Sequence, residues 1–173
     1  MVIQADCMKW LAGQPNGAFG SVITDPPEDF TSEQLRMLLR VSRGPVVIMA
    51  PCIWIGESFP RSTAVRGQDA VDVWLCNSGP QRGWAPILLY RCKPNGCLGE
   101  HETKATIEKP LALMQGIVGA WGALTVLDPF CGTGTTGIAC RDLGFDFIGI
   151  EQSHELCEVA RRRICEETVD VVS

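Results

Sequence analysis

Two short segments of this sequence combine acidic residues, prolines and glycines in a way that suits chemistry on a bound small molecule. The first is the segment 127–136, which reads LDPFCGTGTT and leads from an apolar run through a glycine-rich turn into a helical pattern. Glycines at 132 and 134 remove side chains that would keep a ligand away from the backbone. The free amides at the start of the next helix can face a polar or anionic group. The segment therefore predicts a ligand-binding loop.

An acidic residue follows this loop at a distance that suits a ribose. The next apolar run ends in Glu151, whose carboxylate is placed to accept hydrogen bonds from two ribose hydroxyls. Together the loop and Glu151 predict a nucleoside-containing cofactor. The segment 132–137 also fits the G-x-G-x-x-G pattern of dinucleotide folds. Such a fold needs several further strands, however, and only one strand and one helix are expected after the pattern here.

The second segment is 23–27, which reads ITDPP. An apolar strand there delivers a carboxylate and two prolines to its carboxyl end, where open α/β sheets place their active sites. Taken alone, the segment is equally typical of an ordinary turn, because prolines commonly end strands. The second Asp-Pro pair, which follows another apolar strand at 128–129, favours a functional role.

The elements that must position these segments alternate between short β-branched runs and helical patterns, as in a largely parallel sheet covered by helices on both faces. The seven candidate strands are Val2–Gln4, Ser21–Thr24, Val46–Ala50, Val71–Leu75, Ile87–Arg91, Thr125–Asp128 and Asp146–Ile150. The candidate helices run from a cap at Thr31 or Ser32 to Gly44, from Lys109 to Trp121, from Thr135 to Leu143, and onward from Ser153. The stretches 52–68 and 77–86 are rich in Gly, Pro and polar residues and predict loops.

The bulk composition favours one compact domain, because 173 residues with 46% hydrophobic content can bury a substantial core. No apolar run is long enough for a membrane span and no signal-peptide pattern is present, so we expect a cytoplasmic protein. Nine cysteines in such a chain predict reduced thiols rather than a disulfide scaffold. Cys92, Cys97, His101 and Glu102 form a loose cluster that lacks the second ligand pair of a zinc site, so no metal is expected.

The net charge of −5 argues against strong unaided binding to a phosphate backbone. Two arginine groups offer local basic faces. They are Arg36, Arg40 and Arg43 at helical spacing, and the run 161–163. A solvated helix surface is the commoner role of such groups.

In their order along the chain, the motifs resemble those of the amino-group DNA methyltransferases that modify adenine N6 or cytosine N4. The resemblance is to the circularly permuted arrangement, in which the catalytic motif precedes the cofactor motif. The segment 25–27 resembles the family's catalytic D-P-P-aromatic motif, and 128–136 resembles its cofactor loop. Three more segments are similar to family motifs: 2–7 to the segment that contacts the cofactor's adenine, 108–113 to a lysine-proline motif, and 149–151 to the ribose-binding strand end.

The resemblance implies a Rossmann-like methyltransferase fold, one catalytic domain over residues 1–173, S-adenosylmethionine as cofactor and DNA as substrate. It implies catalysis by Asp25, Pro26 and Pro27, with the Asp25 carboxylate and the Pro26 carbonyl accepting hydrogen bonds from the amino hydrogens of an extruded base. The cofactor-binding residues that it implies are Asp6, Cys7, Asp25, Lys109, Asp128, Pro129, Phe130, Gly132, Gly134, Thr135, Thr136, Glu151 and Gln152.

The sequence departs from this family at two places. Glu28 stands where the family usually carries an aromatic ring that stacks on the base. Glu28 and Phe30 are the substrate-side candidates, although Phe30, like Trp54 and Trp84, is also typical of a core or loop aromatic. The stretch 90–109 leaves little room for a target-recognition region. We therefore expect low sequence specificity, or recognition supplied by a second copy in a homodimer or by a partner protein.

Two further functions remain open beside the favoured enzyme. Glu28 and the acidic charge suit a catalytically degenerate S-adenosylmethionine-binding protein with an interaction or regulatory role. Methylation of RNA or of a protein glutamine would use the same chemistry. The glutamine enzymes of the family usually carry Asn where Asp25 stands, which disfavours that substrate.

Overall fold

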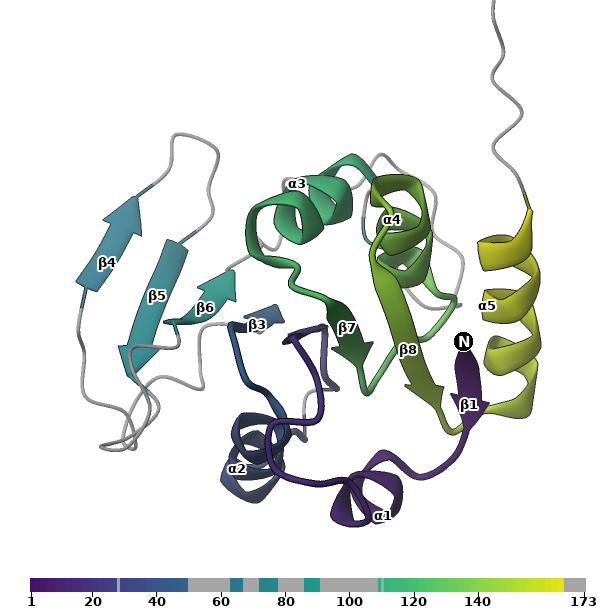
Figure 1. Ribbon diagram of the computed structural model, residues 1–173, viewed down its shortest axis with the longest axis horizontal. Coiled ribbons are helices and arrows are strands. Elements are labelled where there is room, and N and C mark those ends of the chain that lie inside the picture. Colours follow the sequence, from purple (N-terminus) through teal and green to yellow (C-terminus); the bar gives the residue numbers. More distant parts are fainter. Residues whose placement is uncertain are drawn as a thin grey trace, which may run out of the picture.

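The computed structural model describes residues 1–27, 29–49, 63–66, 72–77, 86–90, 109 and 111–166, which form one mixed sheet with helices on both faces (Figure 1). The strands are β1 (Val2–Gln4), β2 (Ser21–Thr24), β3 (Val46–Met49), β4 (Thr63–Arg66), β5 (Asp72–Asn77), β6 (Pro86–Tyr90), β7 (Thr125–Asp128) and β8 (Asp146–Glu151). The helices are α1 (Cys7–Ala12), α2 (Ser32–Val41), α3 (Leu111–Trp121), α4 (Thr135–Leu143) and α5 (His154–Cys165).

The strands lie in the order β1-β8-β7-β2-β3-β6-β5-β4. Every pair from β1 to β6 in this order is parallel, whereas β5 and β4 join antiparallel at the far edge. The two strands that carry the Asp-Pro segments, β2 and β7, are direct neighbours near the middle of the sheet. Their carboxyl ends therefore lie at the same edge of the sheet.

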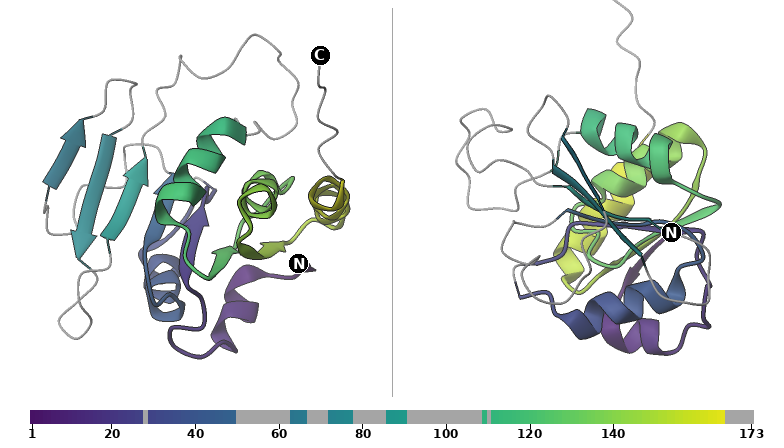
Figure 2. Two further views of the ribbon diagram at one scale, coloured as in Figure 1. Left: turned by 45° about the horizontal axis from the view of Figure 1, so that its top comes forward. Right: turned by 90° about the vertical axis from the view of Figure 1, so that its left-hand side faces the viewer.

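Helices cover both faces of the sheet (Figure 2), and an apolar layer holds them against each face. On one face α1 and α2 contribute Leu11, Leu35, Leu38 and Val41 to a core under β2, β3 and β8. On the other face α3, α4 and α5 contribute Met114, Ile117, Val118, Ala139, Cys140, Cys157 and Ala160. The sheet is thus covered on both sides, as its apolar strands require.

The predicted α/β class with a mostly parallel sheet is confirmed, but the predicted count of seven strands is too low, because the described residues alone form eight. The additional strand, β4, lies inside the stretch 52–68 that was expected to be a loop. It pairs antiparallel with β5, with Ala64 opposite Trp74. A four-residue strand of this kind depends on its neighbour for hydrogen bonds, and the local sequence carries little sign of it.

The start of α2 and the end of α4 follow the predicted capping chemistry, whereas α2 ends at Val41, before the predicted Gly44. Thr31 caps α2 by accepting from the Gln34 amide at 3.2 Å, while the Gln34 side chain accepts from the Thr31 amide at 2.6 Å. Gly144 ends α4 in the left-handed conformation. The six-residue helix α1, which begins after an Asp6 cap, was not predicted, since it is too short to show a helical period.

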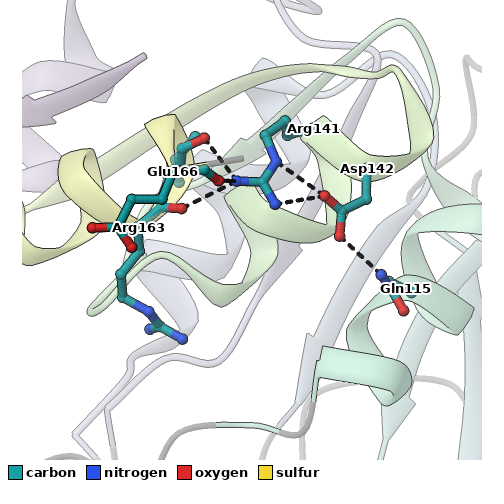
Figure 3. Close-up of polar contacts among 6 residues, drawn as sticks. Gln115, Arg141, Asp142, Arg163 and Glu166 are labelled. Carbon is teal, nitrogen blue, oxygen red and sulfur yellow. Dashed lines mark hydrogen bonds and ion pairs between the residues drawn. The ribbon is translucent and has the colours of Figure 1, made fainter. Parts of the chain in front are cut away.

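A chain of polar contacts joins the three helices of one face (Figure 3). The Arg141 guanidinium of α4 donates to the carbonyls of Arg163 and Ile164 near the end of α5, at 3.2 and 3.1 Å, and also to the carbonyl of Glu166. Arg141 pairs with Asp142 at 2.7 Å, and the Gln115 amide of α3 donates to that carboxylate at 3.0 Å. These contacts satisfy the last carbonyls of α5.

Among the described residues, no helix is long and apolar enough to span a membrane. They also contain no group of three or more potential metal ligands. The loose cluster at 92–102 lies outside the described residues.

Candidate active site

A cavity of about 150 Å³ opens at the carboxyl ends of β2 and β7. It is lined by Asp25, Met49, Lys109, Met114, Asp128, Phe130, Cys131, Gly132, Thr133, Thr135 and Thr136. The parallel pairing of the two strands brings both Asp-Pro segments to this one place, although they are far apart in the sequence. Cavities at this edge of an open α/β sheet are the usual position of a ligand site.

Asp25 leaves the end of β2 and forms an ion pair with Lys109, just before α3, with 2.8 Å between Lys109 Nζ and Asp25 Oδ2. The side chains are 24% exposed for Lys109 and 38% for Asp25. No described residue donates to Asp25 Oδ1 or to the Pro26 carbonyl, whereas the Pro27 carbonyl accepts from the Phe30 amide at 3.1 Å. Of these two acceptors, Asp25 Oδ1 belongs to a cavity-lining residue, whereas Pro26 is buried beside it and is not part of the cavity wall.

Asp128 is a buried carboxylate in the cavity wall. Its Oδ1 accepts from the Thr24 hydroxyl at 2.7 Å and from the Phe130 amide at 3.1 Å, and its Oδ2 accepts from the Thr136 hydroxyl at 2.6 Å. Burial raises the pKa of Asp128 to about 6, although these hydrogen bonds favour the charged form and oppose the rise. Both carboxylate oxygens are therefore engaged by the protein itself.

The glycine-rich loop between β7 and α4 needs glycine at two positions for different reasons. Gly134 has φ 87° and lies against Ala160 of α5, whose Cβ would be 3.0 Å from an added Cβ. Gly132 has φ 50°, and an added Cβ would meet nothing within 4 Å, since its backbone faces the open cavity. Arg163 of α5 holds the loop from outside by donating to the carbonyl and hydroxyl of Thr133, at 2.9 and 2.7 Å.

Glu151 connects the loop to the end of β8. One carboxylate oxygen accepts from the Gly132 amide at 3.0 Å, and the other accepts from the Ser153 amide at 2.8 Å. Asp6, after the neighbouring strand β1, accepts from the Lys9 amide at 2.9 Å and caps α1. Burial, reinforced by Asp6, raises the pKa of the Cys7 thiol to about 11, so Cys7 stays protonated at neutral pH.

The structure brings a subset of the sequence-predicted residues into the cavity wall. Those in the wall are Asp25, Lys109, Asp128, Phe130, Gly132, Thr135 and Thr136. Those described elsewhere are Asp6, Cys7, Pro26, Pro27, Pro129, Gly134, Glu151 and Gln152. Glu28, Trp54 and Trp84 lie outside the described residues.

Phe30 lies in the core rather than in the cavity wall. Its side chain is 3% exposed, and its ring packs edge-on against Phe130 with 5.9 Å between the ring centroids. Phe130 does line the cavity. In this arrangement Phe30 supports the aromatic ring that faces the cavity, so the reading of Phe30 as a core aromatic fits its position.

Four wall residues were missed by the sequence reasoning: Met49, Met114, Cys131 and Thr133. Cys131 and Thr133 lie inside the predicted ligand-binding loop, so their position in that loop could have identified them as cavity residues. Met49 ends β3 and Met114 lies on α3, where each is typical of an ordinary core residue. Burial raises the pKa of the Cys131 thiol well above its usual range, which makes it an unreactive wall residue.

One arginine of the first predicted group and two of the second make side-chain contacts within the fold, namely Arg40, Arg161 and Arg163, whereas Arg36, Arg43 and Arg162 are exposed. Arg40 donates to the carbonyls of Leu11 and Gln14 at the end of α1, at 2.6 and 2.7 Å. Arg161 donates to the Val2 carbonyl at 3.0 Å and pairs with Glu158. Neither arginine therefore presents an unengaged guanidinium to a phosphate backbone.

Known proteins match both the sequence and the fold. Residues 42–162 match the model of the N6/N4 methyltransferase family, described as DNA methylase. The type II methyltransferase M2.MboI of Moraxella bovis is 43% identical over 82 residues, which make up 46% of this chain and 30% of that enzyme. The chain thus spans less than a third of the length of this relative.

Solved structures extend the comparison over nearly the whole chain. The M1.HpyAVI complex with S-adenosylmethionine matches with a TM-score of 0.62 and 22% identity, covering 94% of this chain and 98% of that one. The cytosine-N4-specific PvuII DNA methyltransferase matches with a TM-score of 0.59 and 14% identity, covering 97% and 87%. At these identities the likeness shows the fold, and the predicted methyltransferase-type fold is confirmed. Because the family match spans most of the sequence, the chain belongs to the DNA methylase family of N6/N4 methyltransferases.

Proposed function

We propose that this protein binds S-adenosylmethionine and transfers its methyl group to an exocyclic amino group of a DNA base, adenine N6 or cytosine N4. The observation that carries the proposal is the shared cavity. Asp25 at the end of β2 and the glycine-rich loop after β7 line the same wall. A methyl acceptor and a methyl donor must meet at such a place.

The residues of the loop fit a nucleoside-containing methyl donor. The Gly132 backbone faces open space that any larger residue would fill, and α4 begins without a side-chain cap, which leaves its first amides for a polar ligand. Glu151 has acceptor capacity beyond its two backbone contacts, because each carboxylate oxygen carries two lone pairs. When bound, S-adenosylmethionine supplies an electrophilic methyl group on a positively charged sulfur.

The catalytic work of the protein in this proposal is to redirect a lone pair. The lone pair of an aromatic amine is delocalised into its ring, which makes the nitrogen a poor nucleophile. Asp25 Oδ1 and the Pro26 carbonyl are the acceptors that bind the two amino hydrogens and favour a pyramidal nitrogen. The ion pair with Lys109 holds the other Asp25 oxygen in place.

Recognition of DNA is expected to involve more than these residues. We propose that residues 1–173 act as one catalytic domain in the permuted motif order, in the cytoplasm. Target recognition then comes from a second copy of the chain or from a partner protein. This agrees with the net charge of −5 and with the internal use of Arg40 and Arg161.

The test is transfer of labelled methyl groups from S-adenosylmethionine to single- and double-stranded mixed-sequence DNA. We expect the wild type to label DNA and Asp25→Ala to lose at least about 100-fold of the rate at equal cofactor saturation. Asp29→Ala is the matched control, because this exposed carboxylate lies four residues further on and outside the cavity wall. Equal rates for the wild type and Asp25→Ala would contradict the assigned role of Asp25.

The second candidate function is a cofactor-binding protein without transferase activity, and the specific observation behind it is Glu28 in place of an aromatic residue. Calorimetric binding of S-adenosylmethionine without DNA labelling would favour it. Labelling of RNA or of a protein glutamine instead of DNA would move the same chemistry to another substrate.

A further inference from the structure

The Thr24 side chain connects the ends of β2 and β7, beyond the last residues at which these two strands pair through their backbones. The backbone ladder between β2 and β7 pairs Ser21 with Val126 and Val22 with Leu127. Beyond that point, the described contact between the two strand ends is the hydrogen bond from the Thr24 hydroxyl to Asp128 Oδ1, at 2.7 Å. Thr24 is fully buried and Asp128 is 3% exposed, so water competes little for this bond.

This bond lies between the two segments that the proposed function assigns to the methyl acceptor and the methyl donor. Thr24 directly precedes Asp25, the proposed acceptor for the amino hydrogens. Asp128 binds the Phe130 amide and the Thr136 hydroxyl, at the two ends of the glycine-rich loop. One side-chain bond therefore connects the carboxylate that would hold the methyl acceptor to the loop that would hold the methyl donor.

We propose that Thr24 is a positioning residue for methyl transfer, which sets the Asp25 strand end in register with the glycine-rich loop through Asp128. The proposal rests on the function proposed above and concerns the geometry of the same site. Thr24 itself does not line the cavity, so it acts through Asp25 and Asp128. A misplacement of about 1 Å between reacting groups can reduce a rate by roughly 100-fold. Loss of the Thr24 hydroxyl is therefore expected to lower kcat more than it weakens cofactor binding.

Three variants separate positioning from general stability. Thr24→Val removes the hydroxyl but keeps the β-branched shape, and Thr24→Ser keeps the hydroxyl. Thr136→Val is the matched control, because it removes a buried hydroxyl bond to the same carboxylate from α4 instead of from β2. For each variant kcat is measured at saturating cofactor and DNA, the cofactor Kd by calorimetry, and the amide exchange of residues 23–25 by mass spectrometry.

The expected result is a fall in kcat of about 10- to 100-fold for Thr24→Val, a cofactor Kd within about 3-fold of the wild type, and recovery to within about 3-fold in Thr24→Ser. Amide exchange at 23–25 should rise in Thr24→Val and stay near the wild-type rate in Thr136→Val. Thr136→Val should instead raise the cofactor Kd more than Thr24→Val does, because Thr136 lies at the end of the glycine-rich loop that is proposed to bind the cofactor.

Two results would overturn the proposal. One is a wild-type kcat in Thr24→Val. The other is an equal loss of kcat in Thr24→Val and Thr24→Ser, which would mean that any change of packing at this buried position lowers the rate and that the hydroxyl has no specific role. If the wild type labels no nucleic acid or protein, the proposed function fails. The exchange comparison then still decides whether Thr24 holds the strand end.

Discussion

The ion pair between Lys109 and Asp25 assigns different tasks to the two oxygens of one carboxylate. Lys109 holds Oδ2 at 2.8 Å, and Oδ1 has no donor among the described residues. The resemblance to known methyltransferases places the lysine-proline motif near the cofactor, whereas this contact places Lys109 on the proposed catalytic carboxylate. Both side chains are partly exposed, so the pair contributes little to stability and its value lies in orientation.

Replacement of Lys109 tests whether its side chain orients Asp25 or binds the cofactor. We expect Lys109→Met to lower kcat by about 10-fold or more at saturating cofactor, because the Asp25 carboxylate loses its anchor. Lys109→Arg keeps the charge and should retain more activity. In an Asp25→Asn background, Lys109→Met should add little, since the two residues act as a unit.

The same kinetic measurements could instead assign Lys109 to cofactor binding. An unchanged kcat together with a raised cofactor KM would mean that Lys109 binds the cofactor directly. Calorimetric titration with S-adenosylhomocysteine, which does not react, would then show the same loss of affinity. Such a result would leave the proposed role of Asp25 intact.

Three arginines of the described residues connect one element of the fold to another. Arg40 of α2 caps the end of α1, Arg163 of α5 binds the glycine-rich loop, and Arg141 of α4 binds the last carbonyls of α5 (Figure 3). Short helices leave a large fraction of their backbone groups unpaired, and these guanidinium groups satisfy several of them. Arginine suits this task because its planar group offers five donors.

The link between α1 and α2 can be tested by a comparison within one helix. Arg40→Met keeps most of the aliphatic stem but removes the donors to Leu11 and Gln14, so we expect a loss of about 1 to 3 kcal/mol in the free energy of unfolding. Arg36→Met, at an exposed position on α2, should change it by less than about 0.5 kcal/mol. Urea unfolding with a constant m-value is the measurement. Equal effects of the two substitutions would contradict the capping role.

The whole molecule shows which features a local pattern can predict. Glycine, proline and capping residues predicted the loop before α4, the bounds of α4 and the Ser153 cap of α5, because these features depend on neighbours within a few residues. The parallel sheet followed from the alternation of strands and helices. The family resemblance then predicted which segments would share a site, and the order of strands in the sheet brings 25–27 and 128–136 together.

Other features depend on contacts between distant residues and had no local signal. The pairing of Lys109 with Asp25, the capping of α1 by Arg40 and the burial of Phe30 behind Phe130 all require the folded arrangement. The strand β4 is likewise defined by its antiparallel pairing with β5 and not by its own sequence. The sequence therefore predicted which segments lie around one cavity, while the individual contacts between their atoms came from the structure.

Global stability should depend on the protonation of Asp128, a carboxylate that the fold buries in the cavity wall. Burial raises the pKa of Asp128 from its ordinary value of 3.8 to about 6. Between these two pH values the folded state binds a proton that the unfolded state has lost, so stability falls as pH rises through this range. Below it, both states are protonated and the stabilisation is fully present.

Asp128→Asn removes this titration while keeping a side chain of the same shape. We expect the variant to gain stability relative to the wild type as pH rises from 4 to 7, by on the order of 3 kcal/mol in the free energy of unfolding. Urea unfolding at several pH values across this interval measures the difference, and constant m-values confirm that both proteins unfold in one cooperative step. A difference that is the same at pH 4 and pH 7 would mean that Asp128 keeps its charge at low cost. The hydrogen bonds from Thr24, Thr136 and the Phe130 amide would then outweigh the effect of burial.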